Sequence, residues 1–347
     1  MSKIKMLVLS LTGRCNFACR YCYAAEHNKS KMTVTTAIAA VKMAAESGEK
    51  FIIQFSGGEP LLNWATMKAV IDYVAEHKIN ATMQLQTNGS KLTDEIAQYL
   101  FVHKVGIGIS LDGRPSVNDK LRLKKNGYGA TGDILKGIEV LRRNNIACGV
   151  TCVVTNENVK ELAGIIEFAY FLGNVRKIGF DILRNQGRGV DLHAPSEEDM
   201  YTAMEHVYAR RDALTRLTGT YITISQQERV KTLCNNCTHE FGHCYAMNGE
   251  AMFVDAQGDI YACSSLVGGK EFYIGNVKEG LAENHVEHVQ KIISEAMDFC
   301  RKCPAFKLCG GGCFARWYGL ENKDEYGAEC AMKRVSIQQV VGTGKDK

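Results

Sequence analysis

The sequence has no long apolar run, no dominant charge, no internal repeat and no low-complexity segment. No apolar stretch reaches the roughly 18 residues that a membrane-spanning helix needs, so we expect no membrane segment. The 42 Lys and Arg residues are interleaved with 38 Asp and Glu residues, which leaves a net charge of only +4. This balance does not indicate binding to nucleic acid or to a membrane, and we expect neither kind of partner.

We also expect no secretion signal. The apolar run Met6–Leu11 is short and is followed by a polar loop, so it predicts a first strand and not a signal peptide. The chain of 347 residues nevertheless contains 14 cysteines. In a chain of this size without an export signal, metal binding explains them better than disulfides do. We therefore expect a reducing, anaerobic cytoplasm.

Three of these cysteines, Cys15, Cys19 and Cys22, form a CxxxCxxC group after the first apolar run. Thiolates this close together can face one centre, and they are the preferred ligands of iron–sulfur clusters. Because a cubane cluster takes four ligands, three protein sulfurs leave one iron open for a substrate or cofactor. The alternatives at this point are a zinc site or a loop that binds no metal.

Six strand-like apolar runs alternate with segments of helical apolar spacing. The expected strands are Met6–Leu11, Phe51–Ser56, Thr82–Gln86, Gly106–Leu111, Cys148–Thr155 and Lys177–Leu183. The clearest helical segments are Val34–Ser47, Trp64–His77 and Thr131–Asn144. Such β/α repeats predict an α/β fold with a parallel sheet covered by helices.

Three motifs lie at the ends of the second, third and fourth expected strands: Gly57–Pro60 (GGEP), Gln86–Gly89 (QTNG) and Ser110–Gly113 (SLDG). The carboxyl ends of parallel strands are where α/β barrels place their chemistry. The two glycines of GGEP permit close backbone approach to a ligand, and Glu59 adds a carboxylate that can accept hydrogen bonds from an ammonium group. Without the cysteine group, GGEP would be read as an ordinary turn.

With Tyr21 before the third cysteine, this order of motifs closely resembles the radical S-adenosylmethionine (SAM) superfamily. The resemblance implies a partial (β/α)6 TIM-like barrel and a [4Fe–4S] cluster on Cys15, Cys19 and Cys22, whose open iron chelates SAM. Reduction would cleave SAM to methionine and a 5′-deoxyadenosyl radical that abstracts a substrate hydrogen. The implied SAM contacts are Gly57, Gly58, Glu59, Pro60, Gln86, Asn88, Ser110, Asp112 and Arg122. For Arg122, the alternative interpretation is a solvated arginine on the surface.

We expect the barrel to occupy residues 1–216 and a second domain to occupy residues 217–347. Ser196 precedes three acidic residues and predicts the N-cap of a helix that runs toward Arg216. Leu217–Thr220 then reads as the connection, beyond which the β/α rhythm stops. Gly249–Cys263 predicts a hairpin that turns at its Gln-Gly pair.

Nine of the 14 cysteines lie in the final third of the chain. Their spacing resembles the SPASM extension of radical SAM peptide-modifying enzymes, which implies two auxiliary [4Fe–4S] clusters. The first would use Cys244, Cys263 and Cys313 with Cys237, or with Cys234 in its place. The second would use Cys300, Cys303, Cys309 and Cys330. A zinc site on Cys234 and Cys237 with His239 or His243 is the alternative. Cys148 and Cys152 are left over as buried apolar residues.

The resemblance implies hydrogen abstraction from a ribosomally made peptide or protein, giving a thioether or carbon–carbon crosslink. The runner-up is an anaerobic sulfatase-maturating, formylglycine-forming enzyme, which the short stretch before Cys15 favours. Members of that branch typically carry an aspartate base after the residue matching Cys263, where this chain has Ser264. Asp181 is then the first candidate base. A non-catalytic polycluster electron carrier is the alternative of another class.

The expected partners follow from this chemistry. They are the peptide or protein substrate, a low-potential electron donor such as flavodoxin or ferredoxin, and a separate peptide-recognition protein.

Overall fold

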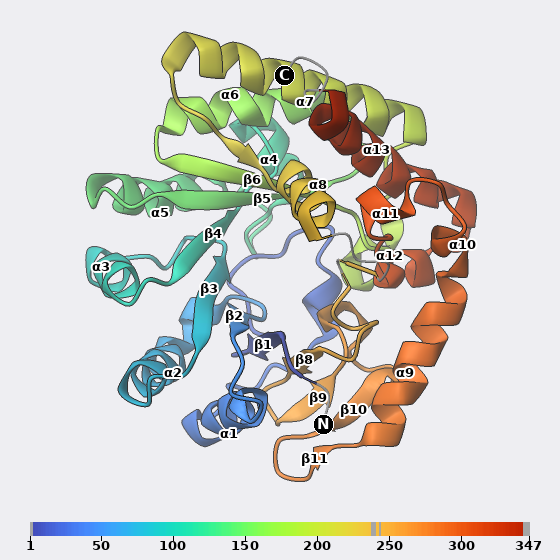
Figure 1. Ribbon diagram of the computed structural model, residues 1–347. Coiled ribbons are helices and arrows are strands. Elements are labelled where there is room, and N and C mark those ends of the chain that lie inside the picture. Colours follow the sequence, from blue (N-terminus) through green and yellow to red (C-terminus); the bar gives the residue numbers. More distant parts are fainter. Residues whose placement is uncertain (1–2, 237–240, 243, 343–347) are drawn as a thin grey trace. The chain divides into compact units, whose positions relative to one another are not determined.

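The structure is a computed structural model that describes residues 3–236, 241–242 and 244–342 (Figure 1). Its contacts divide the chain into two compact units. The first unit comprises residues 3–16, 23–108 and 245–296, and the second comprises the described parts of 17–22, 109–244 and 297–342. The boundary expected near residue 216 stays a prediction.

The first unit contains a sheet with the strand order β11-β10-β9-β8-β1-β2-β3. β1, β2 and β3 are parallel neighbours, and β8 adds to β1 in the same direction. Helices α1 and α2 lie along its outer side (Figure 1). The bounds are β1 (Met6–Ser10), β2 (Phe51–Ser56), β3 (Ala81–Thr87), β8 (Ala251–Val254), β9 (Asp259–Tyr261), β10 (Tyr273–Asn276), β11 (Gly280–Leu281), α1 (Val34–Ala45), α2 (Trp64–Glu76), α3 (Asp94–Val102) and α9 (Glu283–Ala296).

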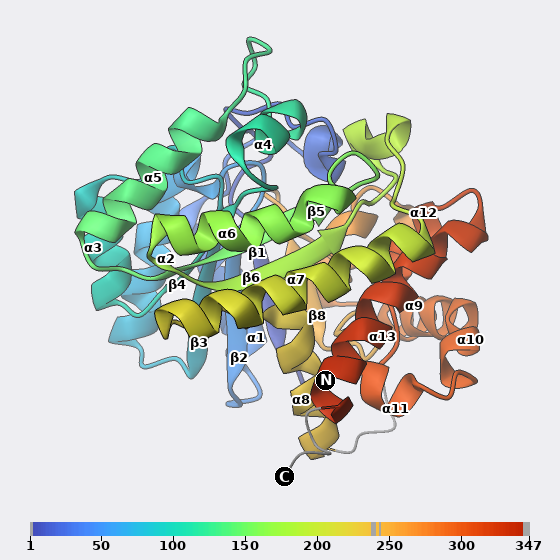
Figure 2. The same cartoon turned by 90° about the horizontal axis from the view of Figure 1, so that it is seen from above.

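The second unit contains the parallel strands β5, β6 and β7, paired in that order. Helix α7 lies alongside both α6 and α13 (Figure 2). β4 (Gly106–Ser110) spans the division between the units. The other bounds are β5 (Cys148–Val154), β6 (Val175–Ile182), β7 (Thr223–Ile224), α4 (Pro115–Leu121), α5 (Thr131–Arg143), α6 (Leu162–Leu172), α7 (Glu197–Thr218), α8 (Ser225–Asn236), α10 (Asp298–Arg301), α11 (Phe306–Cys309), α12 (Phe314–Gly319) and α13 (Gly327–Val341).

All six expected strands are confirmed with ends within two residues, and so are the three helices named from the sequence. The strands were readable because their alternate side chains are buried: in β2, Phe51, Ile53 and Phe55 point into the core. Ser196 caps α7 as expected, since its hydroxyl accepts a hydrogen bond from the Asp199 amide at 3.0 Å.

The expected connection after α7 requires a correction. The helix continues to Thr218 and ends at Gly219, whose φ of 70° is the left-handed conformation that favours glycine. The β/α rhythm then continues for one more repeat, because β7 pairs with β6 and leads into α8. A two-residue strand carries no readable period, so the sequence could not reveal it.

The hairpin predicted within Gly249–Cys263 is confirmed as the antiparallel pair β8 and β9. Gly258 turns it with a φ of 93°, and the Asp255 carboxylate accepts hydrogen bonds from the Gln257 and Asp259 amides. Among the residues that the structure describes, no helix is long and apolar enough to cross a membrane.

Candidate active site

The GGEP loop packs against the backbone that leads into Cys15. The Gly58 amide donates to the Thr12 carbonyl at 2.7 Å, and the Glu59 amide donates to the Arg14 carbonyl at 2.9 Å. A Cβ atom on Gly58 would stand only 2.4 Å from the Arg14 carbonyl oxygen. The glycine therefore allows close approach to the backbone that leads into the cysteine loop (residues 15–22), in addition to any role toward a ligand.

Glu59 joins the GGEP loop to the QTNG loop. Its side chain is fully buried, and its carboxylate accepts hydrogen bonds from the Leu61 amide (3.1 Å), the Thr87 hydroxyl (2.7 Å) and the Asn88 amide (2.8 Å). Burial raises the pKa of this carboxyl, and the three donors oppose the rise. Pro60 follows at the first position of a short 3₁₀ helix. Thr87 is a supporting residue that sequence reasoning missed.

Asn88 carries the connection on to the first cysteine. Its amide nitrogen donates to the Asn16 side-chain oxygen at 3.0 Å and lies 3.9 Å from the Cys15 sulfur. In the same unit, Gly108 leaves room for Gln86, because a Cβ there would meet the Gln86 amide oxygen at 2.6 Å. The first unit thus brings Glu59 and Asn88 together with Cys15. It also places the Gln86 side chain next to Gly108 of β4.

The second unit brings Cys19 and Tyr21 together with Asp112 and Arg122. Arg122 and Asp112 form a buried ion pair, with Nε 2.9 Å from Oδ2 and Nη2 3.1 Å from Oδ1. The Tyr21 hydroxyl donates to Asp112 at 2.5 Å, and Arg122 Nη1 lies 3.9 Å from the Cys19 sulfur. Ser110 is half-buried at the end of β4.

These contacts set the charge states of the group. Burial lowers the pKa of Arg122, but the Asp112 carboxylate outweighs it, so the net pKa is raised and the guanidinium stays charged. Burial raises the pKa of Tyr21 well above its usual value, which keeps the phenol neutral. Arg122 is therefore buried and not the solvated arginine of the alternative interpretation.

The four cysteines expected to hold the second auxiliary cluster lie near one another in the second unit. Burial raises the pKa of the Cys330 thiol to about 11, and the charges of Cys300, Cys309 and Cys303 add to the rise. Lys333 is held close by, with its amine donating to the Gly311 carbonyl. A set of thiols beside a cation suits an anionic thiolate cluster. In the described part of the chain, no three His, Cys, Asp or Glu side chains already stand at metal-binding distance.

The residues expected for the first auxiliary cluster do not all belong to one unit. Cys244 and Cys313 belong to the second unit, Cys263 belongs to the first, and Cys237 lies outside the described residues, as do His239 and His243. Cys234, the alternative to Cys237, is half-buried on α8. None of the 13 described cysteines forms a disulfide.

Cys313 lies in a charged network that the sequence did not reveal. Burial raises the pKa of its thiol, but the charges of Arg316 and Arg184 outweigh that effect and lower it. Asp181, the candidate base, lies 2.7 Å from Arg184 and 3.1 Å from Arg316. Burial raises the pKa of Asp181, and the two arginines lower it by more, so the carboxylate stays ionised. Arg316 also pairs with Glu329.

Ser264 and its neighbours occupy the first unit. The Tyr23 hydroxyl donates to the Ser264 hydroxyl at 3.4 Å, and the His27 ring packs edge-on against Tyr23 and Phe253. Burial first, and the charge of Lys29 second, lower the pKa of His27 to about 4. The imidazole is therefore neutral at pH 7.

Cys148 and Cys152 are buried in β5, as their interpretation as apolar residues predicts. Burial raises the pKa of the Cys148 thiol to about 12 and that of Cys152 well above its usual value. Such thiols stay protonated and are poor metal ligands.

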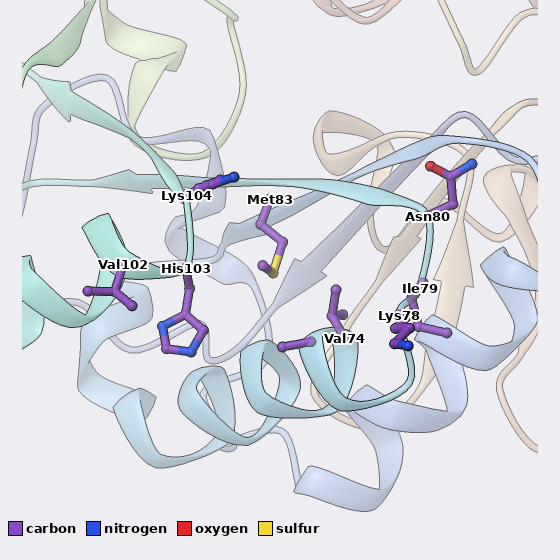
Figure 3. A pocket seen from close by; sticks show the side chains of 9 residues that line it. Val74, Lys78, Ile79, Asn80, Met83, Val102, His103 and Lys104 are labelled. Atoms are coloured by element: carbon purple, nitrogen blue, oxygen red, sulfur yellow. The ribbon is translucent and has the colours of Figure 1, made fainter.

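A cavity of about 550 Å³ in the first unit lies away from these motifs. Figure 3 shows Ile79 and Asn80, which precede β3, and His103 and Lys104, which precede β4, along its wall. It therefore lies at the amino ends of these strands, whereas the GGEP and QTNG motifs lie at the carboxyl ends of β2 and β3.

Similarity to known proteins decides the family. The family model of the radical SAM superfamily matches residues 9–169. An uncharacterized protein of Methanocaldococcus jannaschii is 34% identical over 268 residues, which is 76% of this chain and 86% of that protein. The chain belongs to the radical SAM superfamily. Radical SAM proteins bind a [4Fe–4S] cluster and SAM, and the networks around Cys15 and Cys19 fit that use.

Two further relatives of this radical SAM chain have assigned activities. The radical SAM cyclopropyl synthase TigE of Paramaledivibacter caminithermalis is 25% identical over 99% of this chain and 75% of that protein. The cysteine-type anaerobic sulfatase-maturating enzyme of Clostridium novyi is 24% identical over 90% of this chain and 88% of that protein.

Solved structures confirm the fold class predicted from the sequence, a radical SAM barrel followed by a SPASM extension. The structure titled anSMEcpe with bound AdoMet matches with a TM-score of 0.81 at 18% identity, covering 99% of this chain and 98% of that one. Streptococcus suis SuiB bound to the precursor peptide SuiA matches with a TM-score of 0.69 at 14% identity, covering 93% and 74%.

Proposed function

We propose that this radical SAM enzyme abstracts a hydrogen from a side chain of a ribosomally made peptide or protein and forms a thioether or carbon–carbon crosslink. SuiB, which shares the fold, binds a precursor peptide, and that supports a peptide substrate here. The relation to the cyclopropyl synthase TigE over nearly the whole chain supports a radical chemistry other than formylglycine formation. A flavodoxin or ferredoxin would supply low-potential electrons, and a separate protein would recognise the peptide.

The serine at position 264 is the observation that favours a crosslink over formylglycine as the product. Formylglycine formation in the sulfatase-maturating branch uses an aspartate base after the residue that matches Cys263. Here that position holds a serine, whose hydroxyl accepts a hydrogen bond from Tyr23. A serine hydroxyl is a poor base at neutral pH, so this position favours a reaction that needs no carboxylate there.

The chain's own residues would orient the reacting groups. The cluster on Cys15, Cys19 and Cys22 would supply the electron that cleaves SAM to methionine and the 5′-deoxyadenosyl radical. Asn88 and Arg122 present N–H groups to the Cys15 and Cys19 sulfurs, and Glu59 fixes the loop that carries Asn88. Hydrogen bonds to cluster sulfurs tune the reduction potential.

A crosslinked product contains two hydrogens fewer than its substrate. One hydrogen leaves as an atom, and the other leaves as a proton while one electron passes to an acceptor. Two auxiliary clusters on the C-terminal cysteines would be suitable electron acceptors. We propose the assignment given above, with Cys237 as the fourth ligand of the first auxiliary cluster.

Formylglycine formation remains the second candidate, because the Clostridium novyi sulfatase-maturating enzyme aligns with 90% of this chain. Asp181 would then be the base. Its pairing with Arg184 and Arg316 keeps it ionised and able to accept a proton, but it also lowers its basicity. An electron carrier, the alternative of another class, would not bind SAM, and calorimetry on the reconstituted chain separates it from both enzymes.

Mass spectrometry of two incubations tests the proposed function. A peptide encoded beside the gene should lose two hydrogens per crosslink, whereas a sulfatase-derived Cys-x-Pro-x-Arg peptide should yield only uncoupled 5′-deoxyadenosine. Robust formylglycine formation on the sulfatase peptide would contradict the proposal. An Asp181→Asn variant that then lost this activity would identify Asp181 as the base.

A further inference from the structure

The Asp112 carboxylate is buried, and both of its oxygens are already bonded within the protein. The side chain is 1% exposed, and an ionised carboxylate offers about four lone-pair sites. Arg122 contacts one oxygen through Nη2 at 3.1 Å and the other through Nε at 2.9 Å. The Val153 amide donates to Oδ1 at 2.9 Å and the Tyr21 hydroxyl donates to Oδ2 at 2.5 Å. Three acceptor sites thus carry hydrogen bonds, and Arg122 Nε covers the rest of Oδ2 as an ion contact without a hydrogen bond. Because the Asp112 side chain is fully buried, neither oxygen is exposed to a hydroxyl group of SAM.

The same contacts fix the position of Arg122. The guanidinium is held on one edge by Asp112, and its central carbon lies 5.3 Å from the centroid of the Tyr21 ring. Its remaining nitrogen, Nη1, lies 3.9 Å from the Cys19 sulfur. The helix α4 supports the arrangement, because Asn118 accepts a hydrogen bond from the Asp112 amide with its side chain and one from the Arg122 amide with its carbonyl.

We propose that Asp112 and Tyr21 are positioning residues, which hold the Arg122 guanidinium against the Cys19 sulfur, and that Asp112 is not a SAM contact. Cys19 and Tyr21 both belong to the cysteine loop. Tyr21 helps to hold the Arg122 guanidinium in place, and the Cys19 sulfur lies beside the positive charge of that guanidinium. A buried cation beside a ligating sulfur favours the more negative, reduced state of the cluster. Asp112 partly cancels that cation.

Opposite shifts in reduction potential are the expected result. Asp112→Asn leaves the buried cation uncompensated and should raise the potential of the SAM-responsive cluster signal, whereas Arg122→Gln should lower it. The double variant Asp112→Asn with Arg122→Gln removes both charges and should return toward the wild-type value. Reconstituted protein is titrated with a reductant and followed by electron paramagnetic resonance. Arg114→Gln, which breaks an exposed ion pair with Glu167, is the control and should change nothing.

The affinity for SAM separates the two roles of Asp112. Calorimetry on the reconstituted chain should give a Kd for the Asp112→Asn variant within about twofold of the wild type. A loss of tenfold or more with an unchanged potential would overturn the proposal and make Asp112 a SAM ligand. If Asp112→Asn alone does not fold, Arg122→Gln still decides it, because a merely structural role would leave the potential of that variant unmoved. No peptide is present, so the outcome does not depend on the proposed substrate.

Discussion

At the scale of single residues, His27 gives the protein a pH dependence that can be measured. Its pKa is lowered to about 4 in the folded chain, against about 6.5 for an exposed histidine. Between these values the unfolded chain binds the extra proton, so the free energy of unfolding falls as the pH drops from about 6.5 toward 4. The slope from one such group is at most about 1.4 kcal/mol per pH unit.

A His27→Phe variant keeps an aromatic ring against Tyr23 and Phe253 but removes the titration. Urea unfolding at pH 7, 6 and 5 should show a shallower loss of stability on acidification than in the wild type. The exposed residue His77 provides the matched control, since His77→Phe should keep the wild-type slope. Equal slopes for wild type and His27→Phe would show that burial does not set the charge state of His27.

At the scale of elements, the contact between the GGEP loop and the cysteine loop is the one on which the site most depends. In a Gly58→Ala variant the new Cβ would lie 2.4 Å from the Arg14 carbonyl oxygen, so one loop must move. We expect a loss of about 1–3 kcal/mol in the free energy of unfolding and a lower content of bound iron.

Gly132→Ala is the matched control for that substitution. Gly132 lies in α5 with open space where the Cβ would be, so alanine there should stabilise the chain by about 0.4–1 kcal/mol and leave the iron unchanged. Urea unfolding and iron analysis check both variants. A Gly58→Ala chain as stable and as iron-rich as the wild type would refute the close contact.

The elements also show what the sequence could and could not reveal. The strand β2 was predicted to the residue, because its buried apolar positions alternate and polar residues follow. The parallel pairing of β8 with β1 was not, since Met6 and Ala251 are remote in the chain and periodicity does not choose partners. The hydrogen bonds to the Asp112 carboxylate were hidden for a similar reason, because its partner Tyr21 stands 91 positions away in the chain. Residue type identified the site, but only the fold shows which lone pairs are taken.

At the scale of the whole molecule, three groups of thiols are proposed to hold three cubane clusters, or about twelve iron atoms per chain. Changing Cys15, Cys19 and Cys22 together to alanine should remove about four of them. Cys148→Ala is the control that should remove none, because its thiol is buried in β5. Loss of all iron from the triple variant, or of none, would contradict this division of the cysteines.

The most direct test of the central claim is the amount of 5′-deoxyadenosine formed when the reconstituted chain is reduced in the presence of SAM. The wild type and the Cys148→Ala variant should both produce it. The triple cysteine variant should produce none, even though its remaining iron is still reducible. Formation of 5′-deoxyadenosine by the triple variant, or its absence from the fully loaded wild type, would contradict the assignment of the catalytic cluster to Cys15, Cys19 and Cys22.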